Sequence, residues 1–160
     1  MDRIRDAFVR SAAMADAAGF DLLELHCAHG YLLHTFLSPL SNQRNDEYGG
    51  DLNGRMRFPL EVFRAVRAVW PQDKPMAVRV SATDWVEGGF TVDECITFAR
   101  ELVASGCDLM DVSSGGITPE SKPQYGRLYQ TPFAERIRHE VDVPVMTVGN
   151  ISSYADCNSV

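Results

Sequence analysis

The sequence predicts an α/β fold built on a parallel sheet. Segments with the 3.6-residue periodicity of amphipathic helices alternate four times with short, almost continuously apolar segments. Such apolar segments are typical of parallel strands that are buried on both faces. The chain has 160 residues, whereas a whole (β/α)8 barrel typically takes about 250. We therefore expect either a small doubly wound sheet or a partial (β/α)8 TIM barrel with about four βα units.

Helices are expected at residues 2–18, 54–69, 92–104 and 131–140. The first two carry apolar residues at helical spacing, with Gly19 as a stop signal after one and Pro71 after the other. The third begins after Thr91, because Thr91 and Glu94 have the spacing of a capping box.

Strands are expected at residues 20–25, 76–80, 108–112 and 144–148. About 28 residues, 26–53, separate the first strand from the second helix. A loop of this length inside a compact α/β domain is usually functional. A helical-looking segment from 152 stops at the C-terminus. We therefore expect 1–160 to be a single segment, about half of a barrel, truncated at both ends.

The composition excludes several classes of protein. Hydrophobic residues make up 45% and charged residues 23%, which excludes wholesale disorder. The net charge is −7 and the basic residues do not cluster, so neither nucleic acid nor a membrane is an expected partner. Cys27, Cys95, Cys107 and Cys157 form no C-x-x-C pair and predict reduced thiols in a cytoplasmic protein.

Polar and small residues follow each expected strand. They are His26-Cys27-Ala28-His29-Gly30-Tyr31, then Ser81, Thr83, Asp84 and Trp85, then Ser113-Ser114-Gly115-Gly116, and finally Gly149-Asn150. In parallel α/β folds, ligands bind beyond the carboxyl ends of the strands. We therefore expect the site at this edge. The Ser-Ser-Gly-Gly run is a weak phosphate nest without a Walker pattern, and a simple turn explains it equally well.

His26 and His29 are the sharpest candidates. Two imidazoles can donate hydrogen bonds to one oxygen, and Tyr31 nearby could give a proton to a carbanion-like carbon. The same pair could ligate a metal ion together with Cys27 or His34, although no further ligand stands at a convincing spacing. Two ordinary, hydrogen-bonded loop histidines also explain the pattern. Spacing alone leaves all three interpretations open.

Arg79 lies among apolar neighbours in the second strand, where a guanidinium costs free energy unless it is paired. An ion pair with Asp111 or Glu24 would explain it, and so would a cation that faces an electron-rich ligand. Cys27 beside His26 could be an activated thiol. Strand alternation points it away from His26, however, so a catalytic thiol is not expected.

Longer motifs carry a family resemblance. They are HCAHGYLL at 26–33, FLSPLSN at 36–42, Arg44 and Asp46 with YGG at 48–50, Arg55, VRVS at 78–81 and VGNI at 148–151. Together they resemble the signature of the old yellow enzyme family, over essentially the whole chain. Members are FMN-dependent NAD(P)H oxidoreductases on a (β/α)8 barrel. The resemblance implies an oxidoreductase with FMN as cofactor and NADH or NADPH as co-substrate.

The resemblance also implies roles for individual residues. His26 and His29 match the pair that binds the carbonyl oxygen of a small-molecule substrate, and Tyr31 matches the proton donor. Arg79 matches the arginine beside the N1/O2 edge of the flavin, which favours the ligand-facing cation. Gly149 matches a glycine whose backbone lies near FMN. The implied reaction passes hydride from NAD(P)H through FMN to an activated alkene.

Two further segments, Ser81–Gly89 and Lys122–Ala134, are similar to the reductase half of the anthraniloyl-CoA and salicylyl-CoA monooxygenase group. That likeness implies an enone or aromatic acyl-CoA derivative as substrate. The family's early strands and its FMN-phosphate segment have no counterpart here, so we expect these 160 residues to bind FMN poorly. A non-catalytic half-barrel, which assembles with a second copy or with the rest of a barrel, and a zinc hydrolase built on His26 and His29 are the alternatives.

Overall fold

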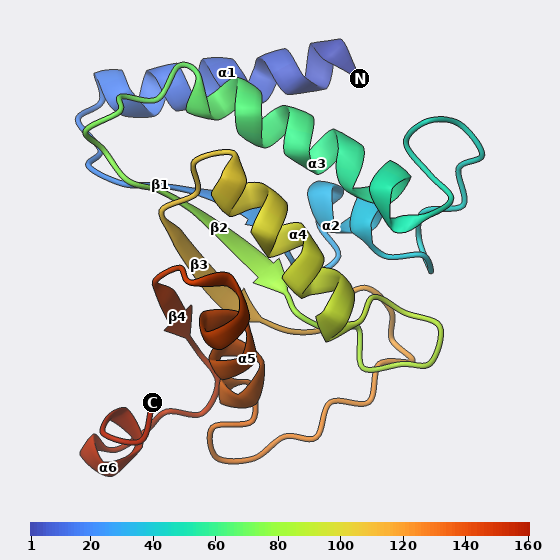
Figure 1. Cartoon of the computed structure of the whole chain (residues 1–160), viewed down its shortest axis with the longest axis vertical. Coiled ribbons are helices and arrows are strands. Elements are labelled where there is room, and N and C mark those ends of the chain that lie inside the picture. The colour runs from blue at the N-terminus through green and yellow to red at the C-terminus, as the bar shows by residue number, and fades with distance from the viewer.

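Four parallel strands form one sheet in which consecutive strands are neighbours, in the order β1-β2-β3-β4 (Figure 1). The computed structural model describes all 160 residues. Its elements are α1 (Asp2–Ala17), β1 (Leu23–Cys27), α2 (Leu32–Leu37), α3 (Leu52–Arg67), β2 (Met76–Ser81), α4 (Val92–Ala104), β3 (Leu109–Ser113), α5 (Thr131–Val141), β4 (Val145–Thr147) and α6 (Tyr154–Cys157). Sequential order is the arrangement of a (β/α)8 barrel, whereas the order of a doubly wound sheet reverses. The prediction of a partial barrel is confirmed.

The largest differences from the predicted elements lie at the first strand and just after it. The sequence predicts a strand at 20–25, but β1 is Leu23–Cys27, so His26 lies within the strand. Helix α2 was not predicted, because six residues are too few to display a helical period. The capping box of α4 is confirmed: Thr91 accepts from the Glu94 amide, and the Glu94 carboxylate accepts from the Thr91 amide.

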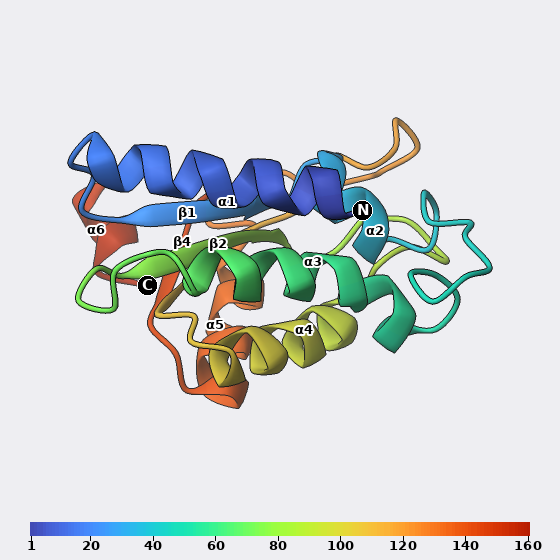
Figure 2. The ribbon, with the colours of Figure 1, turned by 90° about the horizontal axis from the view of Figure 1, so that it is seen from above.

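The helices cover only one face of the sheet. The sequence predicts strands that are buried on both faces, but on the face without helices Glu24 and Met146 are exposed. The helices pack on one another in sequence, α1 on α3, α3 on α4 and α4 on α5 (Figure 2). We call the sheet face beneath them the helix-covered face; it carries Leu25, Cys27, Val78, Val80, Met110 and Val112, all buried. No helix in the chain has both the length and the apolar character needed to cross a membrane.

The opposite face, which we call the open face, carries Glu24, His26, Arg79, Ser81, Asp111, Ser113 and Met146. Strand alternation separates the two faces by a single residue, so polar and apolar side chains interleave along each strand. In a barrel this second face is the interior. Most of the predicted site residues therefore belong to the open face or to the loops at its carboxyl edge.

Candidate functional site

Three charged or ionisable residues stand side by side across the open face. His26 of β1 is in register with Arg79 of β2, and Arg79 is in register with Asp111 of β3. The Arg79 Nε atom lies 3.3 Å from Asp111 Oδ2. The Asp111 side chain is 3% exposed, whereas that of Arg79 is 30% exposed. The ion pair with Asp111 is therefore present, and the guanidinium still reaches the accessible part of the face.

The ion pair leaves hydrogen-bonding capacity unused. Arg79 Nε and Asp111 Oδ1 are both buried without a hydrogen-bond partner. Buried polar atoms without partners are rare and often mark a place where a ligand or water completes the structure. Arg79 can therefore pair with Asp111 and also face an electron-rich ligand. The two interpretations that the sequence left open are thus compatible.

His26, His29 and Tyr31 form a ring cluster at the carboxyl end of β1. The ring centroids of His26 and His29 lie 5.3 Å apart, and those of His26 and Tyr31 lie 5.2 Å apart. His29 has a φ of 56°, in the left-handed region, and its backbone N–H donates to Ser81 Oγ at 3.0 Å. Tyr31 is 65% exposed. The structure therefore brings together the three predicted catalytic residues on the same edge as Arg79.

Two glycines let the loops of β1 and β3 touch backbone to backbone. A Cβ atom on Gly30 would lie 2.4 Å from the Gly116 carbonyl oxygen, and one on Gly116 would lie 2.6 Å from the His29 Cα atom. Both glycines have positive φ values. The sequence placed Gly116 in a weak phosphate nest. In the structure it instead leaves room for the loop after β1 that carries His29, residues 28–31, which we call the histidine loop.

A buried dyad beneath the histidine loop was missed by sequence reasoning. His34 Nδ1 accepts from the Gly30 amide at 2.9 Å, so the Nε2–H group of His34 donates to Asp84 Oδ1 at 3.1 Å. Asp84 also accepts from the Ser38 hydroxyl and the Phe90 amide, both at 2.6 Å. Burial alone would raise the pKa of Asp84, but these hydrogen bonds hold it below its ordinary value.

Gln130 connects the ends of β3 and β4 and was also missed. Its side-chain Oε1 accepts from Ser113 at 3.3 Å and from Ser114 at 2.5 Å, and its Nε2 donates to the Val148 carbonyl at 3.1 Å. Gly149 has a φ of +109°, in the region that favours glycine, and a Cβ atom there would lie 2.6 Å from Gln130 Nε2. No sequence signal distinguishes Gln130 from an ordinary residue before a helix.

Electrostatics keep both histidines of the cluster neutral near pH 7. Burial lowers the pKa of His26 and of His29, and the positive charge of Arg79 lowers each further. A neutral imidazole carries one N–H donor and one acceptor nitrogen. Cys27 lies in the core, and burial raises the pKa of its thiol, as expected for a side chain on the helix-covered face.

Residues 1–159 match the family model described as "NADH:flavin oxidoreductase / NADH oxidase family". The chain belongs to this family. It is 48% identical over 147 residues to the NADPH dehydrogenase of Geobacillus sp. (strain WCH70), an alignment that covers 92% of this chain and 42% of that protein. The chain thus spans less than half the length of such relatives.

Solved structures of related proteins share the fold. The old yellow enzyme homologue from Zymomonas mobilis aligns with a TM-score of 0.77 at 25% identity, over 99% of this chain and 45% of that one. A 2-naphthoyl-CoA reductase aligns with a TM-score of 0.89 over 99% of this chain and 25% of that one, at 24% identity, which supports the fold alone. The family resemblance predicted from the histidine motif is confirmed.

Neither residue suggested as an extra metal ligand is free to join the histidine pair in this NADH:flavin oxidoreductase family member. Cys27 points into the core, and His34 is committed to Gly30 and Asp84. No group of three or more His, Cys, Asp or Glu side chains has a geometry that could hold a metal ion. The zinc hydrolase alternative therefore has no supporting geometry.

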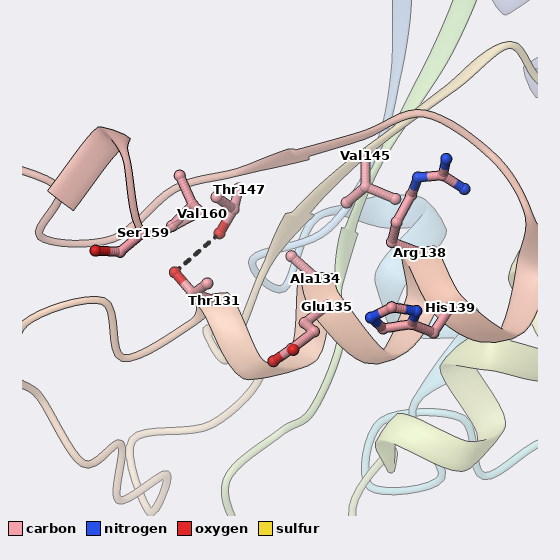
Figure 3. Close-up of a pocket in the computed structure, with 9 residues that line it drawn as sticks. All are labelled: Thr131, Ala134, Glu135, Arg138, His139, Val145, Thr147, Ser159 and Val160. Atoms are coloured by element: carbon pink, nitrogen blue, oxygen red, sulfur yellow. Dashed lines mark hydrogen bonds between the residues drawn. The ribbon is translucent and has the colours of Figure 1, made fainter.

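A separate pocket of about 320 Å³ lies between α5, β4 and the C-terminal residues (Figure 3). Its lining consists of Thr131, Ala134, Glu135, Arg138, His139, Val145, Thr147, Ser159 and Val160. None of the predicted site residues is among them. The chemistry that the sequence predicts belongs to the open face and its carboxyl edge.

Proposed function

We propose that this chain is the part of an FMN-dependent ene-reductase that binds the substrate, and that the whole protein passes hydride from NADH or NADPH through FMN to an activated alkene. One observation carries the proposal. The rings of His26, His29 and Tyr31 are clustered at the strand edge that Arg79 also faces. A pair of oxygen-binding donors, a phenol and a cation are the groups that such a reduction requires.

The residues around Arg79 fit the flavin that the family name implies. The Nε atom faces Asp111, but the Arg79 side chain is 30% exposed on the open face, so the remaining N–H groups of the guanidinium are left for a second electron-rich neighbour. When bound, FMN supplies a two-electron carrier whose reduced form is anionic. Arg79 would stabilise that negative charge, and the Gly149 backbone would contribute to the same cofactor site.

His26 and His29 hold the carbonyl oxygen of the substrate. Both rings are neutral, so each offers a single N–H group, and the hydrogen bonds strengthen as negative charge develops on the oxygen. Tyr31 has an exposed phenol beside His26 and delivers a proton to the α-carbon. The substrate is therefore an alkene conjugated to a carbonyl group.

The substrate class is an enone derived from an aromatic acyl-CoA, and the parent protein is a monooxygenase-associated reductase. The support is the segment around Trp85, which has a φ of 58° and packs edge-on against Phe133 with ring centroids 5.3 Å apart. A pair of aromatic side chains suits a planar aromatic ligand. The cytoplasmic location and any oligomeric state stay predictions.

The test uses a phenol as a mimic of the enolate oxygen. In the flavin-loaded whole protein, His26→Ala and His29→Ala should each weaken 4-hydroxybenzaldehyde binding by about 1.5–3 kcal/mol, roughly 10- to 150-fold, as followed by charge-transfer absorbance. His139→Ala, in α5 and outside the cluster, is the matched control and should change nothing. Unchanged affinity in both site variants would contradict the assigned role.

The competing hypothesis, a non-catalytic half-barrel that assembles with another chain, predicts a protein without flavin absorbance. The β1 and β4 edges of the sheet have no neighbouring strand, which is the observation that favours assembly. Flavin absorbance that co-purifies with the protein would decide for the enzyme.

A further inference from the structure

His29 is linked to the end of β4 by a chain of side-chain contacts through Ser113 and Gln130. His29 Nε2 lies 2.7 Å from Ser113 Oγ, and Ser113 Oγ lies 3.3 Å from Gln130 Oε1. The other ring nitrogen of His29, Nδ1, makes no hydrogen bond within the chain and is the one left for a ligand. Ser113 and Gln130 are both buried.

The proton positions in this chain follow from one fixed acceptor. The Val148 carbonyl can only accept, so the Gln130 amide must turn its Nε2 toward it and its Oε1 toward the serines. The Ser113 hydroxyl then donates to Gln130 Oε1, which leaves Ser113 Oγ as the acceptor for His29 Nε2–H. With the Ser113 hydroxyl turned to Gln130, neutral His29 carries its proton on Nε2, and Nδ1 is an acceptor.

This arrangement conflicts with a bound carbonyl. A carbonyl oxygen only accepts, so His29 must present Nδ1–H to it, and a neutral ring then has a bare Nε2. We propose that Ser113 sets the tautomer of His29 by turning its hydroxyl from Gln130 to His29 Nε2 when a carbonyl ligand binds. Nε2 gives up its proton to water and Nδ1 takes one from water, which reaches the part-buried ring, so the charge of the ring does not change.

Ser114 lowers the free-energy cost of rotating the Ser113 hydroxyl away from Gln130. Its hydroxyl donates to Gln130 Oε1 at 2.5 Å, a shorter contact than the 3.3 Å contact from Ser113. When Ser113 turns away, Gln130 keeps Ser114 and Val148 as partners, so no buried polar group is left unsatisfied. The 2.7 Å separation of Ser113 Oγ and His29 Nε2 suits a hydrogen bond in either direction. Ser113 is thus a positioning residue, since it acts on a ligand only through His29.

The inference rests on the proposed function, and the experiment separates the two. In the oxidised, FMN-loaded whole protein no hydride is available, so 2-cyclohexenone binds without reacting. Nitrogen-15 NMR of the His29 ring should report Nε2–H without ligand and Nδ1–H at saturation with 2-cyclohexenone. An Nδ1–H tautomer in the free protein, or a tautomer that does not change at saturation, would overturn the inference. Failure of 2-cyclohexenone to bind the wild type would instead overturn the proposed function, and this inference with it.

Three variants show whether the hydroxyl is responsible. Ser113→Ala removes the partner of His29 Nε2 in both the free and the bound protein, so nitrogen-15 NMR of the free variant should no longer report a clear preference for Nε2–H. Ser113→Thr keeps a hydroxyl and should restore the wild-type tautomer of the free protein and its change on binding. Ser105→Ala, at the end of α4 and away from His29, should behave as wild type. A free Ser113→Ala protein in which Nε2 still carries the proton as in the wild type would refute the role of Ser113, and the wild-type NMR result stands whether or not this variant folds.

Discussion

The helix-covered face and the open face of the sheet use the same strands but opposite chemistry. Cys27, Val80 and Val112 stand in register on the first face and are fully buried among apolar side chains. One residue earlier on each strand, His26, Arg79 and Asp111 stand in register on the second. The shifted pKa values of both histidines belong to the open side. Stability and chemistry are thus separated by one step of strand alternation.

This separation implies that a substitution should affect either folding or catalysis, depending on the face it alters. Residues of the open face carry unsatisfied polar atoms, which lower stability and are retained where a ligand uses them. Residues of the helix-covered face contribute apolar burial and touch no ligand. A substitution in the loops at the carboxyl edge should affect both folding and catalysis.

The largest expected effect is purely catalytic. In the whole protein, Tyr31→Phe keeps the ring beside His26 and removes the hydroxyl, so reoxidation of reduced flavin by an activated alkene should slow by about 10²–10⁴-fold. Flavin reduction by NAD(P)H and reoxidation by oxygen need no proton delivery to carbon and should change little, as should the unfolding free energy. Stopped-flow measurement of the three rates tests this. A collapse of flavin reduction with normal alkene reduction would make Tyr31 a positioning residue for flavin or nicotinamide.

The next effect is purely structural. Met110→Ala removes a fully buried side chain from the helix-covered face and should lower the unfolding free energy by about 2–5 kcal/mol. Met146→Ala is the matched control on the open face, where the side chain is 42% exposed, and should cost much less. Urea denaturation of both variants measures the difference. Equal losses would mean that the two faces are not distinct in stability.

The two faces also differ in how far the sequence could predict them. Apolar periodicity and a capping box predicted the long helices and the strands, because these signals come from the residues of each element alone. The histidine pair, Tyr31 and Arg79 could be singled out because polar residues stand out at the ends of apolar strands. His34 and Asp84 could be named singly, but their pairing and the role of Gln130 could not be predicted, because they depend on partners 16 to 50 residues away. Gly149 and its place beside FMN stay a prediction.

A smaller effect should combine a loss of stability with a loss of ligand binding. Gly116→Ala adds a Cβ atom 2.6 Å from the His29 Cα atom at a φ of +92°, so the histidine loop must move. We expect a loss of about 1–3 kcal/mol in stability together with weaker phenol binding. Gly126→Ala, where a Cβ meets no atom within 4 Å, is the control and should affect neither. Weaker stability with unchanged phenol affinity would mean that this contact does not position His29.

The smallest effect depends on pH and tests the dyad beneath the histidine loop. Asp84→Asn leaves one acceptor oxygen for the His34, Ser38 and Phe90 donors, so stability at pH 7 should fall by about 1–2 kcal/mol. The folded pKa of Asp84 lies below its unfolded value of about 3.9, so the unfolded chain takes up the proton first. The contribution of the carboxylate is therefore complete above about pH 5 and is lost as the pH falls through about 4 toward the folded pKa.

Wild type and Asp84→Asn should accordingly converge in unfolding free energy as the pH is lowered from 7 to 3, followed by urea denaturation at each pH. Asp46→Asn is the matched control. Its carboxylate also has a lowered pKa, first through its hydrogen bond with Arg44, but the pair is exposed and solvent screens it. That variant should follow the wild-type curve throughout. A gap between wild type and Asp84→Asn that stays constant over the whole range would show that the buried carboxylate stabilises the loop through its shape and not through its charge.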